Sequence, residues 1–136
     1  MVAILYICLE NSNRSQIAEA FTRMHGAGRA EAYSAGSAPS SRVGPRAVAA
    51  MRERGYDLTT HRPKSLEEVP GGPWAWVVTM GCGDVCPDAR ASHREDWDLP
   101  DPRDMAAPEF AAVRDEIERR VLDLLARIDA TTSNIV

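Results

Sequence analysis

The 136-residue sequence lacks the features that mark several classes of protein. No apolar run approaches the roughly 18 residues of a membrane-spanning helix, and residues 1–7 carry neither the basic flank nor the cleavage site of a signal peptide. Basic residues are in deficit, since the formal net charge is −4 at pH 7, whereas nucleic acids and acidic membranes attract basic surfaces. We therefore expect a cytoplasmic protein with no nucleic-acid partner and no membrane partner.

Cysteine is also scarce. The three cysteines cannot all pair within one chain, which favours a reducing compartment in which the thiols themselves do chemistry. The hydrophobic content of 44% and the charged content of 26% are those of a globular protein. We expect residues 1–136 to form a single domain whose core needs no disulfides. We also expect a monomer, because the pattern leaves no apolar face to spare.

What the sequence does contain is an alternation of strand and helix patterns. Residues 2–7 form a continuous apolar run, as in a parallel strand that is covered on both faces. Further strands are predicted at 30–33, 74–80 and 93–97, helices at 15–24, 43–51 and 108–128, and a helical turn at 64–69. Two segments without regular structure are predicted, a small-residue loop at 34–41 and a tail at 131–136. This order predicts an α/β fold with an open parallel sheet and helices on both faces.

The stretch from Cys8 to Ser15 connects the first strand to the first helix. A tight loop at this position points its N–H groups at one spot, and the helix dipole adds positive potential there, which suits a tetrahedral oxyanion. Arg14 can hold two oxygens of such an anion. The same field stabilises a thiolate, which predicts Cys8 as a nucleophile. The alternative is that Cys8 is only a buried residue at the end of a strand.

Asp101 lies in a proline-braced turn, residues 98–102, after the last predicted strand. Ligands of open α/β sheets bind at the carboxyl ends of the strands. Asp101 can therefore lie over the anion site and protonate a leaving oxygen. The alternative is an aspartate that only caps its turn.

The other two cysteines, Cys82 and Cys86, follow the third predicted strand. Their spacing places the two sulfurs about one helical turn apart, close enough to bond if the backbone bends, and Gly81 and Gly83 supply that freedom. Two alternatives are a structural pair without chemistry and a zinc site with His93. Zinc sites usually have a different cysteine spacing and two further ligands.

Together, these residues resemble the low-molecular-weight protein tyrosine phosphatase superfamily, and within it the thioredoxin-coupled arsenate reductases. The superfamily resemblance rests on Cys8-x5-Arg14-Ser15-Gln16, Ala18-Glu19, Ser34-Ala35-Gly36, Lys64-Ser65-Leu66 and Asp101-Pro102. The reductase branch is indicated by Thr79-Met80-Gly81-Cys82-Gly83 followed by Cys86-Pro87. The resemblance covers nearly the whole chain and implies a four-stranded parallel sheet in three layers.

The resemblance implies a relay of three thiols. Cys8 would attack arsenate, with Ser15 stabilising the thiolate and Asp101 protonating the departing hydroxide. The substrate, or a phosphate-like or sulfate-like oxyanion, would be held by Leu9, Glu10, Asn11, Ser12, Asn13 and Arg14. Cys82 would then attack Cys8 and release arsenite, and Cys86 would take over the disulfide. Thioredoxin is the expected electron donor, with glutaredoxin or a low-molecular-weight thiol as alternatives.

Some members of this family bind a potassium ion beside the loop. Asn11, Glu19 and Ser34 match that site, although a fourth side-chain ligand is not identifiable; no tightly bound cofactor is otherwise implied. The chain departs from the family pattern at Asn13 and at Glu10, where glycine is usual. A carboxylate at position 10 repels an anion if it points inward and is partly screened by salt if it points outward.

A phosphatase acting on phosphotyrosine or a small phosphoester is the alternative function, since arsenate and phosphate have similar shape and charge. It would need aromatic walls for a phenol ring, which the residues near the loop do not offer, and it would not need Cys82 and Cys86. A binding or redox-sensing module without catalysis would leave Asp101 without a function. The residues therefore favour arsenate reduction and arsenic detoxification.

Overall fold

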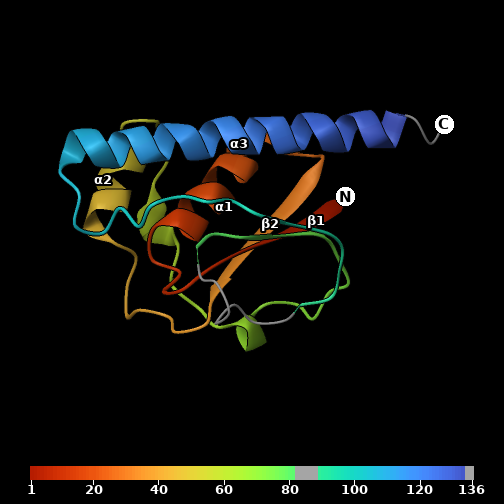
Figure 1. Cartoon of the computed structure of the whole chain (residues 1–136), viewed down its shortest axis with the longest axis horizontal. Helices are drawn as coiled ribbons and strands as arrows, with labels where there is room; N and C mark the ends of the chain where they lie inside the picture. Colours follow the sequence, from red (N-terminus) through yellow and green to blue (C-terminus); the bar gives the residue numbers. More distant parts are fainter. Residues whose placement is uncertain (82–88, 134–136) are drawn as a thin grey trace.

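The structure, a computed structural model, describes residues 1–81 and 89–133. Its strands are β1 (Val2–Cys8), β2 (Ala30–Gly36), β3 (Trp74–Thr79) and β4 (Ala91–Asp96). Its helices are α1 (Arg14–His25), α2 (Pro45–Arg52), α3 (Ala107–Ser133) and two short 3₁₀ helices, η1 (Leu58–Thr60) and η2 (Leu66–Glu68). Figure 1 shows α3 running along one side of the molecule, with α1 and α2 beneath it.

β1 lies at the centre of a four-stranded parallel sheet with the order β2-β1-β3-β4. Its residues pair with β2 on one side and β3 on the other, so that Tyr6 has Ser34 and Val78 as neighbours. Residues 4–7 have no exposed surface, which explains why this strand is continuously apolar. Since β2 and β3 lie on opposite sides of β1, the carboxyl end of β1 is the point where such sheets bind ligands.

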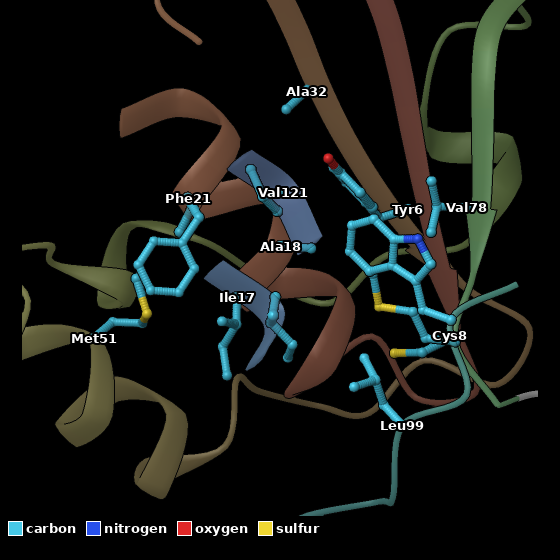
Figure 2. Packing of buried hydrophobic residues seen from close by; sticks show 14 of the residues in the cluster. Tyr6, Cys8, Ile17, Ala18, Phe21, Ala32, Met51, Val78, Leu99 and Val121 are labelled. Atoms are coloured by element: carbon cyan, nitrogen blue, oxygen red, sulfur yellow. The ribbon is translucent and has the colours of Figure 1, made fainter. Parts of the chain in front are cut away.

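The three α-helices cover one face of the sheet and form the larger core with it. Phe21 from α1, Met51 from α2 and Val121 from α3 share one buried cluster with Tyr6 of β1. Figure 2 shows Phe21 beside Met51, and Cys8 at the edge of the cluster near Tyr6. Cys8, the candidate nucleophile, is therefore the last residue of a strand whose preceding residues are packed on both faces.

A smaller apolar cluster covers the opposite face. Leu5, Ile7 and Val77 of the sheet pack there with Val69, and Leu66 of η2 lies against them. The parallel sheet and its layering with helices are confirmed. Within residues 1–81 and 89–133, however, the helical element on this second face is the short η2, whereas all three α-helices lie on the first face.

Two predicted boundaries are wrong. Residues 34–36 belong to β2 and not to a loop, because they pair with residues 6–8 of β1. Their small size is required there, since a Cβ on Gly36 would lie 2.7 Å from the carbonyl oxygen of Leu9. The strand thus continues to the edge of the thiol loop, residues 9–13 between β1 and α1.

α3 extends beyond the predicted end of its helix, to Ser133, where a tail was expected. The predicted apolar stripe is buried and consists of Phe110, Val113, Ile117, Val121, Leu124, Leu125 and Ile128. The extra turn is supported by a hydrogen bond from Thr131 Oγ1 to the Arg127 carbonyl oxygen at 3.0 Å. Among the described helices, α3 included, there is none with the length and apolarity that crossing a membrane requires.

The buried stripe of α3 gives a stability prediction. Ile117 has no exposed surface, whereas Leu122 on the same helix is 46% exposed. We expect Ile117→Ala to lower the free energy of unfolding by about 2–5 kcal/mol, because it leaves a cavity in the main core. The matched variant Leu122→Ala should change it by less than about 0.5 kcal/mol. Equilibrium urea unfolding measures both, and equal losses would contradict the assigned core face.

Candidate active site

The loop that leaves β1 turns its carbonyl groups away from its N–H groups. The carbonyl oxygens of Leu9, Glu10 and Ser12 accept hydrogen bonds of 2.8–3.0 Å from backbone N–H groups in residues 38–44. In the part of the chain that the structure describes, the N–H groups of residues 10–14 donate to no protein acceptor. Free N–H groups gathered at the start of a helix form an anion-binding cradle.

The Cys8 thiol ends a directed chain of hydrogen bonds. Its Sγ lies 2.8 Å from Ser15 Oγ, and Asn11 Nδ2 donates to the same Oγ at 2.7 Å. Because Asn11 already supplies a hydrogen to Ser15 Oγ, the Ser15 hydroxyl can turn its own hydrogen toward Cys8 Sγ. A hydrogen bond donated to sulfur favours the ionised thiolate over the thiol.

Asn11 is itself held from several directions. Its φ of 52° is left-handed, a conformation that asparagine tolerates better than most residues. Gln16 Nε2 donates to Asn11 Oδ1 at 3.0 Å and to its carbonyl oxygen at 3.1 Å. The backbone N–H of Lys64 also donates to Asn11 Oδ1 at 3.0 Å. These contacts fix the amide that orients Ser15.

Behind Gln16 lies a histidine that the sequence did not single out. His61 Nδ1 is 2.8 Å from Gln16 Oε1, so Nδ1 carries the hydrogen, and His61 Nε2 then accepts from the Tyr56 hydroxyl at 2.6 Å. Burial lowers the pKa of His61, which suits the neutral ring that this pattern requires. No motif surrounds this histidine in the sequence, and only the fold places it near the loop.

The Arg14 guanidinium is fixed at the edge of the cradle. Its Nη1 donates to the carbonyl oxygen of Leu99 at 3.0 Å, and its Nη2 lies 4.0 Å from Asp101 Oδ2. Gly81, with a φ of 73°, approaches it so closely that a Cβ there would lie 2.6 Å from Nη1. Among residues 1–81 and 89–133, the other N–H groups of the planar fork have no hydrogen-bond acceptor, so they can donate to an anion.

The structure brings most of the predicted site residues to one small hollow. Its lining consists of Cys8, Leu9, Glu10, Ser12, Asn13, Arg14 and Asp101. Asn11, also predicted to bind substrate, is not part of this lining and contacts Ser15. The Asn13 amide lies against Gly44, where a Cβ would be 2.2 Å from Asn13 Oδ1, so it braces the loop.

Glu10 has a partner that the sequence did not predict. Arg103 Nη2 lies 3.1 Å from Glu10 Oε2 and 3.3 Å from Asp101 Oδ2, and the Arg103 backbone N–H donates to Asp101 Oδ1 at 3.1 Å. The hydrogen bond to Asp101 and the nearby Glu10 carboxylate raise the pKa of Arg103. The unusual carboxylate at the rim is therefore compensated by a guanidinium.

Cys82 and Cys86 lie outside the described residues. The predicted relay and the zinc alternative both depend on these two cysteines and stay predictions. The chain just before them is described. The Met80 N–H donates to a β1 carbonyl oxygen at 2.9 Å, and Gly81 then lies against Arg14. The chain therefore enters the two-cysteine segment beside the anion site.

The predicted potassium ligands lie close together beside the loop. Ser34 Oγ donates to Glu19 Oε1 at 2.7 Å, and Asn11 is linked to them through Lys64. The Lys64 side chain shares the cluster, with Nζ 3.7 Å from Glu19 Oε1 and 3.4 Å from Ser34 Oγ. The cluster thus already contains a positive charge.

The hydrogen-bond chain predicts the reactivity of Cys8. In a Cys82→Ser/Cys86→Ser background, in which Cys8 is the remaining thiol, we expect iodoacetamide to alkylate Cys8 faster than it alkylates free cysteine under the same conditions. Ser15→Ala should slow it about tenfold or more, because a hydrogen bond to a charged group contributes about 1.5–3 kcal/mol. Phosphate should protect Cys8.

The matched control for this measurement is Ser41→Ala, since Ser41 is exposed and lies outside the loop. It should leave the alkylation rate unchanged. Alkylation of Cys8 no faster than that of free cysteine, or equal rates in the two serine variants, would remove the argument for an activated nucleophile.

Comparisons with known proteins identify the family of the chain. The chain matches the family model "Low molecular weight phosphotyrosine protein phosphatase" over residues 3–134. It is 35% identical over 131 residues to the glutaredoxin arsenate reductase of Synechocystis, which covers 94% of this chain and 99% of the relative. A solved arsenate reductase in the phosphate-binding state has a TM-score of 0.84 at 33% identity, covering 94% of this chain and 99% of that one.

A further solved structure is the thioredoxin-dependent arsenate reductase of Corynebacterium glutamicum. It has a TM-score of 0.79 at 32% identity and covers 96% of this chain, whereas this chain spans 63% of the longer neighbour. The matched range, residues 3–134, includes nearly all of β1, the loop after Cys8 and Asp101. The chain belongs to the low molecular weight phosphotyrosine protein phosphatase family.

Proposed function

We propose that this protein reduces arsenate to arsenite. The observation that carries the proposal is the Cys8 thiol at the base of a cradle of free N–H groups, with Arg14 at its edge and the two-cysteine segment entering beside it. The relatives named as arsenate reductases, one of them solved with phosphate bound, support the same reaction. Arsenate and phosphate are both tetrahedral oxyanions that such a cradle accommodates.

In the first step the Cys8 thiolate attacks arsenic. A sulfur–arsenic bond forms, and the departing hydroxide leaves as water with the proton of the Asp101 carboxyl group. Ser15 holds the thiolate before the attack, while Arg14 and the loop N–H groups hold the oxygens on which negative charge accumulates. Each of these groups lies at or directly behind the hollow.

In the second step Cys82 attacks Cys8 Sγ. A disulfide forms between them, and the electron pair of the sulfur–arsenic bond stays on arsenic, which leaves as arsenite. Cys86 then attacks Cys82 and frees the Cys8 thiolate, and an external dithiol reduces the Cys82–Cys86 disulfide. The two electrons gained by arsenic are those that the donor finally supplies.

Thioredoxin is the donor that we favour, because the relay ends in a disulfide within one chain. The relatives divide on this point, since one is named for glutaredoxin and another is described as thioredoxin-dependent. The protein acts as a monomer in the cytoplasm, where such donors are kept reduced.

Phosphoester hydrolysis is the second candidate function, and the family match favours it. The hollow itself argues against a phenol substrate, since none of its described lining residues is aromatic. The Glu10–Arg103 ion pair also stands at its rim, where a bulky ester group would have to pass. A small inorganic oxyanion meets neither obstacle.

The relay predicts a clear separation of activities. With thioredoxin, thioredoxin reductase and NADPH, we expect arsenate-dependent oxidation of NADPH, measured by absorbance, in parallel with a glutaredoxin assay. Cys82→Ser should abolish this turnover but leave any slow hydrolysis of an aryl phosphate intact, because only reduction needs the second thiol. If Cys82→Ser reduces arsenate as well as the parent does, the relay is wrong.

The rim charges predict a double-variant cycle on the KM for arsenate. Arg103→Ala removes the guanidinium that faces Glu10 and leaves Asp101 with Arg14 alone, so KM should rise by up to about fivefold, the range expected for an exposed pair. Adding Glu10→Gln should recover part of the loss, and added salt should reduce it. Arg52→Ala, on the exposed end of α2, is the control. An additive cycle would show that Glu10 and Arg103 act independently.

A further inference from the structure

Lys64 occupies the position where the family resemblance led us to expect a potassium ion. Its backbone and its side chain both take part in the cluster beside the thiol loop. The N–H donates to Asn11 Oδ1 at 3.0 Å, and the carbonyl oxygen accepts from the Gly36 N–H at 2.9 Å. The ammonium group, which is mostly buried, lies 3.7 Å from Glu19 Oε1 and 3.4 Å from Ser34 Oγ.

The oxygen atoms that a potassium ion would need are already engaged. Glu19 Oε1 accepts from Ser34 Oγ, and Glu19 Oε2 lies 2.9 Å from Arg23 Nη2 and 3.4 Å from His61 Nδ1. Asn11 Oδ1 accepts two hydrogen bonds of 3.0 Å. A second cation would therefore have to share the Glu19 carboxylate with the Lys64 ammonium and the Arg23 guanidinium, so the residues present do not fit potassium while the Lys64 side chain is in place.

We propose that the Lys64 ammonium permanently replaces the potassium ion, and that Lys64 is a positioning residue for the thiol site. The role of Lys64 in catalysis rests on the proposed function, whereas the contacts that support it join protein groups only. This replacement makes the chain independent of potassium. The replacement also explains why no fourth potassium ligand is identifiable in the sequence, because Lys64 supplies a positive charge in place of a ligand for one.

The ammonium supports Cys8 through three successive contacts. Its side chain anchors Lys64 to Glu19 and Ser34, which fixes the backbone N–H that holds Asn11. Asn11 orients the Ser15 hydroxyl, and that hydroxyl contacts Cys8 Sγ. A change at Lys64 should therefore reach the thiol although the two residues do not touch.

Glu19 requires a cation at this place. Its side chain is 3% exposed, and without the Lys64 ammonium the Glu19 Oε1 atom would lose its neighbouring cation, while Arg23 remains paired with Oε2. Burial lowers the pKa of Lys64, and the neighbouring Glu19 carboxylate opposes that shift. A tethered ammonium meets the need without depending on the concentration of a free ion.

The test compares thermal unfolding in KCl and NaCl at one ionic strength. The parent should melt at the same temperature in both salts. Lys64→Gln should melt roughly 5 °C or more lower in NaCl and recover part of that loss in KCl only, since the amide oxygen can bind the ion that the vacated position then accepts. Lys64→Met, which has no oxygen, should be destabilised to a similar extent with less recovery.

The second readout is the alkylation rate of Cys8 in the Cys82→Ser/Cys86→Ser background. Lys64→Gln should slow it several-fold in NaCl, and KCl should restore it. The matched control is Arg62→Gln, because Arg62 is a neighbouring cation whose ion pair with Glu68 is exposed; it should change neither readout. A purely local stabilising role for Lys64 would leave the alkylation rate unchanged.

Stabilisation of the parent by KCl over NaCl would overturn the proposal, because it would show that the site still takes potassium. A Lys64→Gln variant that is as stable as the parent, or that shows no preference for KCl, would also overturn it. The comparison of salts on the parent stands even if a variant fails to fold. Since neither readout uses arsenate or a thiol donor, the outcome is separate from that of the reductase assay.

Discussion

The hydrogen bond from Asn11 to Ser15 determines what the Cys8 thiol can do. It supplies a hydrogen to the serine oxygen and leaves the serine's own hydrogen available for a hydrogen bond to sulfur. Everything behind Asn11 maintains this direction, from the Gln16 amide to the backbone of Lys64. The sheet supplies the other requirement, because β1 is paired on both sides and delivers Cys8 to the same edge as its neighbours.

Charge is arranged in two layers around the thiol. The buried layer lies behind the loop, where Glu19 is compensated by Lys64 and Arg23. The exposed layer lies at the mouth, where Arg103 stands between Glu10 and Asp101. Salt screens the outer layer much more than the inner one. We therefore expect the buried charges to hold the loop in place at any salt concentration, and the exposed charges to influence how readily an anion approaches.

The sequence predicted the local motifs better than it predicted contacts between them. Apolar runs and helical periodicity located the parallel sheet, the three α-helices and the stripe on α3, because local patterns report burial directly. The thiol loop, Arg14 and Asp101 were identified from spacing and are brought together. His61 and the Arg103 bridge could not be found in this way, because the residues through which they reach the loop, Gln16 and Glu10, lie far from them in the chain. The end of β2 was missed because small residues suit both a loop and a crowded strand end.

The close approach of Gly81 to Arg14 joins two parts of the molecule that the chain keeps far apart. One is the guanidinium that holds the anion, and the other is the last residue before the segment with the second and third thiols. The edge of the hollow and the residue from which that segment starts therefore lie against each other. The arginine is therefore a shared boundary, since its guanidinium borders the hollow on one side and the last described residue of that part of the chain on the other.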